Sequence, residues 1–125
     1  DDYAKSVLGK HWPGVPICED IHELTADWLG EHTGHRAVTL VSGGPPCQPV
    51  SLAGKRRGKE DDRYLWPAAL AVVEDIRPAW VCFENPPGFL SMGLDEVLAE
   101  LESQGYETGT VMVPACGVGA WDRRQ

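Results

Sequence analysis

Three stretches of the chain repeat apolar residues at intervals of three and four, the spacing of a helix that buries one face: residues 2–11, 65–76 and 94–101. Pro13-Gly14, Arg77-Pro78 and Gly105 follow these stretches and would end the helices. Residues 19–30 are more polar, and we expect them to be helical as well.

Short runs rich in β-branched and aromatic residues separate these helices and predict strands. Val38–Val41 and Trp80–Phe83 are two such runs, and each ends abruptly in a loop of glycine and proline. We expect both to be buried strands, with Cys82 a small buried hydrophobe. Thr110–Val113 predicts a further strand. The alternation of helix and strand predicts an α/β fold with a mainly parallel sheet and helices on both of its faces.

The two loops that follow the first two strands contain the candidate chemistry, because functional groups of parallel sheets gather at the carboxyl ends of strands. Cys47 lies between Pro45-Pro46 and Pro49, which would fix the direction of its thiol as a nucleophile requires. Glu84 follows apolar strand residues, where partial desolvation would favour a neutral carboxyl that donates a hydrogen bond. Residue chemistry alone leaves two alternatives open, a buried structural cysteine and a carboxylate paired with an arginine.

Charge and cysteine spacing narrow the class of protein. The 125 residues have a formal net charge of −8, yet residues 36–77 carry seven Lys/Arg against five Asp/Glu, so only the middle third is basic. The four cysteines are about thirty residues apart, which predicts no metal site and favours a reducing compartment. No apolar run has membrane-spanning length, and Asp1-Asp2 do not begin an export signal, so we expect a soluble protein.

Several motifs, taken in order, resemble the DNA cytosine-5 methyltransferase family. Gly43–Ser51 is similar to the family's nucleophile loop, and Glu84–Gly88 is similar to its Glu-Asn motif at a strand end. The spacing between the two motifs also matches. Upstream, residues 2–13 and Glu19-Asp20-Ile21 resemble the segments that follow the family's second strand, and the resemblance covers nearly all of the chain.

The resemblance implies a partial Rossmann-like methyltransferase domain that uses S-adenosylmethionine and acts on carbon 5 of cytosine in double-stranded DNA. Cys47 would add to carbon 6 of a flipped base, and Glu84 would hydrogen-bond its ring. Asn85 and Arg124 would complete the catalytic set. The implied cofactor-binding residues are Asp20, Ile21, Pro46 and Leu65. The implied nucleic-acid-binding residues are Gln48, Ser51, Lys55, Arg56 and Arg57.

Residues 1–125 would form only part of this catalytic domain. The family's first strand with its Gly-rich loop, its target-recognition region and its C-terminal motifs are not found in the sequence. Near the end, Asp122 stands where the family usually has Gln, and Arg124 is the best match to the first arginine of the Gln-Arg-x-Arg motif. We therefore expect the activity of the complete protein and not of the isolated 125 residues.

Three alternatives stay open at this stage. A related enzyme with the same chemistry could act on tRNA, a catalytically dead homologue could only bind nucleic acid or protein, and a thiol-redox protein is disfavoured because no cysteines are paired in sequence. For the DNA enzyme we expect a bacterial or phage origin, a cytoplasmic location, a monomer when complete, and a cognate restriction endonuclease as a candidate partner.

Overall fold

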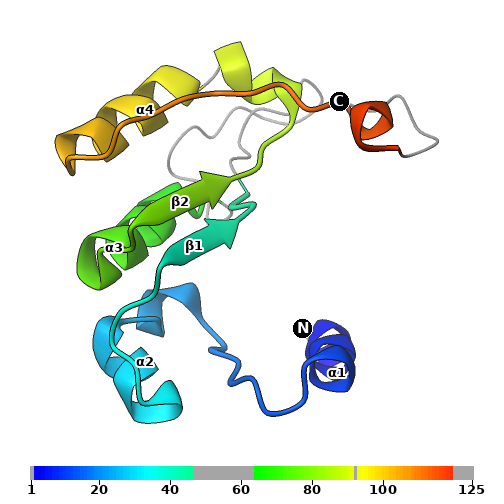
Figure 1. Ribbon diagram of the computed structural model, residues 1–125, viewed down its shortest axis with the longest axis vertical. Helices are drawn as coiled ribbons and strands as arrows, with labels where there is room; N and C mark the ends of the chain where they lie inside the picture. Colours follow the sequence, from blue (N-terminus) through cyan, green and yellow to red (C-terminus); the bar gives the residue numbers. More distant parts are fainter. Residues whose placement is uncertain (1, 47–63, 92, 120–125) are drawn as a thin grey trace.

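A computed structural model of the chain describes residues 2–46, 64–91 and 93–119. Helices and short strands alternate along it (Figure 1). In chain order the elements are α1 (Asp2–His11), the 3-10 turn η1 (Ile21–Glu23), α2 (Ala26–Thr33), β1 (Leu40–Gly43), α3 (Trp66–Ile76), β2 (Trp80–Phe83), η3 (Pro87–Ser91), α4 (Leu94–Ser103) and η4 (Ala115–Val118). Of the helices that are described, none is long and apolar enough to cross a membrane.

The strands β1 and β2 pair in parallel, with α3 as the helix that connects them. Leu40 lies opposite Trp80, and Gly43 lies opposite Phe83. A parallel pair requires such a crossover connection, because a tight turn can join only antiparallel strands. The predicted α/β class and the parallel pairing are confirmed, with the first strand two residues later than the sequence pattern placed it.

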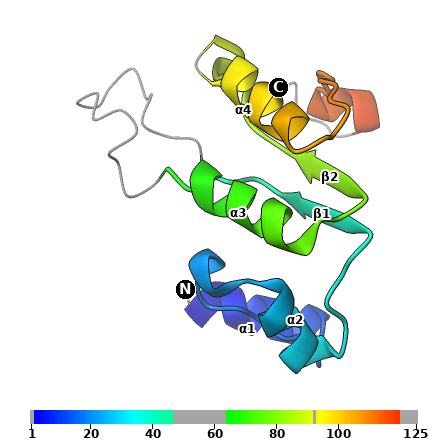
Figure 2. The ribbon, with the colours of Figure 1, turned by 90° about the vertical axis from the view of Figure 1, so that its left-hand side faces the viewer.

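The hydrophobic core is formed mainly by side chains of α3 and α4, with residues of β2 packed against it. Figure 2 shows these two helices next to the sheet. Successive side chains of a strand point to opposite faces, so Val81 and Phe83 pack against this core while Trp80 and Cys82 are exposed. The expectation of two buried strands with a buried Cys82 is therefore wrong. Leu40 of β1 is 53% exposed, and α3 and α4 both pack on the face of β2 opposite Cys82. The buried residues of the core cluster are Trp66, Ala69, Val73, Phe89, Val97 and Leu101.

The predicted helices at residues 65–76 and 94–101 are confirmed as α3 and α4, and α1 has the expected bounds but no buried residue. Residues 19–30 instead divide into η1 and the start of α2. The hydroxyl of Thr25 caps α2 by accepting from Trp28 N at 3.1 Å. Asp75 of α3 accepts from Ala26 N at 2.6 Å, so the start of α2 is attached to the end of α3.

The predicted strand at Thr110–Val113 is not formed, and these residues have no regular structure. Their side chains are exposed, Val111 to 80% and Val113 to 59%. A strand forms only when its backbone pairs with a neighbour, and β1 and β2 pair with each other alone among the described residues. The β-branched residues of this segment favour a strand, but the segment does not pair with either strand of the described sheet.

Candidate active site

The carboxyl ends of β1 and β2 bring two candidate motifs together. The backbone N–H of Glu84 donates to Gly43 O at 2.9 Å, which continues the hydrogen bonding of the sheet one residue past β2. Gly43 begins the motif that leads to Cys47, and Glu84 begins the Glu-Asn motif. The expected meeting of the two motifs at one edge of the sheet is confirmed for the residues that are described.

Gly44 lies directly against Glu84. A Cβ atom at residue 44 would be 3.3 Å from Glu84 Oε2, which is closer than most Cβ contacts, and 3.6 Å from Glu84 O, an ordinary contact. Glu84 itself is exposed, so the expected partial desolvation of its carboxyl is wrong in this structure. The reason is its position, one residue beyond the last paired residue of a two-stranded sheet.

The loop after Glu84 is anchored in the core. Asn85 is half-buried, and Pro86 O accepts from Phe89 N at 2.9 Å. Phe89 is buried, and Gly93 packs so closely against its ring that an added Cβ would lie 2.8 Å from Phe89 Cε2. The hydrogen bond of Glu84 to Gly43 before Asn85 and the buried Phe89 after it limit how far the Glu-Asn motif can shift. A site that positions a substrate requires such restraint.

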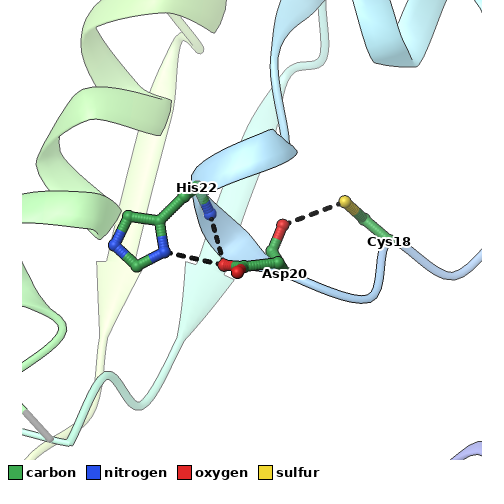
Figure 3. A network of polar contacts seen from close by, with 3 residues as sticks. All are labelled: Cys18, Asp20 and His22. Carbon is green, nitrogen blue, oxygen red and sulfur yellow. Dashed lines mark hydrogen bonds and ion pairs between the residues drawn. The ribbon is translucent and has the colours of Figure 1, made fainter. Parts of the chain in front are cut away.

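Asp20 forms a local network with Cys18 and His22 (Figure 3). Its Oδ1 accepts from His22 N at 2.9 Å and lies 2.7 Å from His22 Nδ1, while the Cys18 thiol donates to Asp20 O at 3.1 Å. The backbone N–H of His22, and after it the His22 side chain, lower the pKa of Asp20. Asp20 is therefore an ionised hydrogen-bond acceptor at neutral pH.

Ile21 and Leu65 both lie beside α3, although they are far apart in the sequence. Ile21 is half-buried and packs against the core cluster that includes Trp66 and Val73 of α3. Leu65 is the residue that precedes α3, and its backbone N–H donates to Pro46 O at 3.3 Å. The structure thus joins two of the predicted cofactor-binding residues directly and places a third against the same helix.

The remaining candidate residues lie outside the residues that are described. They are Cys47, Gln48, Ser51, Lys55, Arg56, Arg57 and Arg124. Their roles stay predictions. Within residues 2–46, 64–91 and 93–119, no group of three or more His, Cys, Asp or Glu side chains could hold a metal ion.

Two features of the site escaped the sequence analysis, the close approach of Gly44 to Glu84 and the burial of Trp66 at the start of α3. The signal for the first was present, since a glycine at the end of a strand often marks a place where another group approaches the backbone. The contact of Trp66 with Glu100 has no local signal, because the two residues are 34 positions apart.

The chain is similar to known proteins along its whole length. The family model described as C-5 cytosine-specific DNA methylase matches residues 1–125. The Type II methyltransferase M.AgeI of Thalassovita gelatinovora is 37% identical over 92 residues, covering 70% of this chain and 21% of its own length. M.FnuDI of Fusobacterium nucleatum, another Type II methyltransferase, is 31% identical over 133 aligned positions, covering 100% of this chain and 37% of its own length. No solved structure gives a significant match.

The chain therefore belongs to the C-5 cytosine-specific DNA methylase family. It spans between a fifth and two fifths of the length of these curated relatives. Gly43, Gly44 and Glu84 all lie within the residues that the family model matches.

Proposed function

We propose that the complete protein transfers a methyl group from S-adenosylmethionine to carbon 5 of cytosine in double-stranded DNA. The observation that carries this proposal is the position of Glu84 beside Gly43 and Gly44, which are four and three residues before Cys47. Family membership supplies the reaction class, and the meeting of the two motifs supports one site for both residues.

In the proposed mechanism the Cys47 thiolate adds to carbon 6 of a cytosine extruded from the duplex. Glu84 hydrogen-bonds ring nitrogen 3 and the exocyclic amino group, which stabilises the charge that develops on the ring during this addition. Carbon 5 becomes nucleophilic as a result. After methylation, carbon 5 loses its proton, the bond from carbon 6 to Cys47 breaks, and the free thiolate is regenerated. Asn85 and Pro46 position the base and the nucleophile loop.

The residues available for S-adenosylmethionine fit an adenine ring. Asp20 offers an ionised carboxylate that can accept from an exocyclic amino group, and the half-buried Ile21 and Leu65 offer apolar surface for the ring. The bound cofactor would supply the electrophilic methyl group. Pro46 lies within this set because its carbonyl is bonded to Leu65 N.

For the complete domain we propose a Rossmann-like sheet with helices on both faces, of which residues 1–125 are a part. The exposed Trp80 and Cys82 mark the face of β2 that further elements would cover. We also propose that Lys55, Arg56 and Arg57 contact DNA phosphates, that Gln48 and Ser51 contact the nucleic acid, and that Arg124 approaches the base. The Type II relatives and their bacterial sources support a cytoplasmic enzyme of a restriction-modification system.

The experiment that tests this function uses the complete protein with labelled S-adenosylmethionine and either duplex DNA or tRNA. We expect label in DNA only, recovered as 5-methylcytosine when the product is digested and its nucleosides are analysed by mass spectrometry. Label in tRNA alone would establish the related RNA enzyme, and absence of transfer to both would identify a homologue that has lost catalysis.

A further inference from the structure

Trp66 is buried where three elements meet. Only 2% of its surface is exposed, and it is the first residue of α3. Its indole Nε1 donates to Glu100 Oε2 of α4 at 2.5 Å, and its ring meets Phe83 of β2 edge-on, with 5.5 Å between centroids and 87° between planes. A buried indole N–H requires a partner, and Glu100 provides it.

The neighbours of Trp66 connect it to both halves of the proposed active site. Leu65, directly before it, donates its backbone N–H to Pro46 O, and Pro46 directly precedes Cys47. Phe83, which Trp66 contacts, directly precedes Glu84. Trp66 therefore contacts Phe83, the residue before Glu84. It also directly follows Leu65, the residue that is hydrogen-bonded to Pro46.

The start of α3 has no side-chain cap of its own, since Leu65 occupies the N-cap position. The contact of Trp66 with Phe83 and its hydrogen bond to Glu100 hold this end of the helix against β2 and α4. A shift of this end of α3 would move Leu65, and with it the hydrogen-bonded Pro46, relative to Glu84.

We propose that Trp66 and Glu100 form a pair of positioning residues that sets the separation between Pro46 and Glu84, and thereby between the nucleophile and the carboxyl group that acts on the base. The proposal rests on the function proposed above. Neither residue needs to touch substrate, because their effect passes through Leu65 on one side and Phe83 on the other.

The test uses the complete protein with three variants of α4. Glu100→Leu removes the acceptor of the indole N–H, Glu100→Gln keeps an acceptor, and Glu102→Leu is the matched control, since Glu102 lies on the same helix but accepts from Thr108 Oγ1 at 2.6 Å. We measure the single-turnover rate of methyl transfer, the Kd for DNA and the melting temperature. Small displacements of reacting groups lower the reaction rate strongly, so we expect Glu100→Leu to slow methyl transfer by about tenfold while the Kd for DNA stays unchanged. Glu100→Gln should retain most of the rate, and Glu102→Leu all of it.

Trp66→Phe provides a second route that keeps a ring against Phe83 but removes the donor. If the two residues act as one pair, Trp66→Phe and Glu100→Leu should each slow transfer, and the double variant should be no slower than the slower single variant. The positioning role would be overturned if the rate losses of the two single variants multiplied in the double variant. It would also be overturned if the Glu100→Leu protein had a lower melting temperature but transferred methyl groups at the wild-type rate. A wild-type enzyme without any transfer would instead refute the proposed function, which keeps the two failures distinct.

Discussion

The backbone of Gly44 lies against the carboxyl group of Glu84, so closely that an added Cβ would be 3.3 Å from Glu84 Oε2. This contact joins the nucleophile motif to the Glu-Asn motif at the edge of the sheet. It makes residue 44 a sensitive position, although glycine is not required there by a positive φ.

We predict that Gly44→Ala lowers the methyl-transfer rate of the complete protein by about tenfold, because the Glu84 carboxyl must move to accommodate the methyl group. The matched control is Gly109→Ala, since an added Cβ at residue 109 has nothing within 4 Å. Single-turnover rates of the two variants decide the matter. Equal rates for Gly44→Ala and Gly109→Ala would show that the Glu84 position tolerates the displacement.

A second prediction concerns the basic run Lys55-Arg56-Arg57. Replacing all three residues with Ala should weaken DNA binding and reduce the salt dependence of what remains, because each phosphate contact releases counterions. Three lost contacts would reduce the slope of log K against log salt by about 2.7. Lys10→Ala serves as a control for loss of a positive charge elsewhere on the chain. An unchanged slope in the triple variant would mean that the run is a solvated loop.

A third prediction concerns the ionisation of Asp20. Its pKa is lowered below the ordinary aspartate value of 3.8, chiefly by the backbone N–H of His22, so the network stabilises the fold above that pH and is lost as pH falls through the lowered pKa. Carboxyl chemical shifts measured by NMR through the acid range should give the midpoint. His22→Ala keeps the N–H, so the pKa of Asp20 should stay below the ordinary value in that variant. A return to the ordinary value in that variant would assign the effect to the imidazole instead.

The sequence was sufficient for the elements with strong local signals. The spacing from Leu65 to Ile76 predicted α3 within one residue, and Trp80–Phe83 predicted β2. The sequence-based predictions failed where the structure of a segment depends on contacts with residues distant in sequence. Thr110–Val113 has strand-forming residues but no described neighbour to pair with, and Cys82 is exposed because both packed helices lie on the opposite face.

The candidate site divides in the same way. Glu84 and Asn85 were predicted from a motif at a strand end, and the structure places Glu84 beside Gly43 and Gly44 as the strand order requires. The packing of Trp66 against Phe83 and its hydrogen bond to Glu100 could not be predicted, since these partners come from β2 and α4 and only the folded chain brings them together.

The central claim is that Cys47 adds to carbon 6 of cytosine, and covalent trapping tests it most directly. In a duplex with 5-fluorocytosine at the target position, fluorine replaces the hydrogen that carbon 5 must lose as a proton before Cys47 is released. The complete wild-type protein with S-adenosylmethionine should therefore remain covalently attached to this DNA. Mass spectrometry of the digested adduct should find the base on Cys47, and Cys47→Ser should not be trapped because its hydroxyl is far less ionised than a thiol. An adduct on Cys18, Cys82 or Cys116, or trapping of the Cys47→Ser protein at the normal rate, would contradict the assignment.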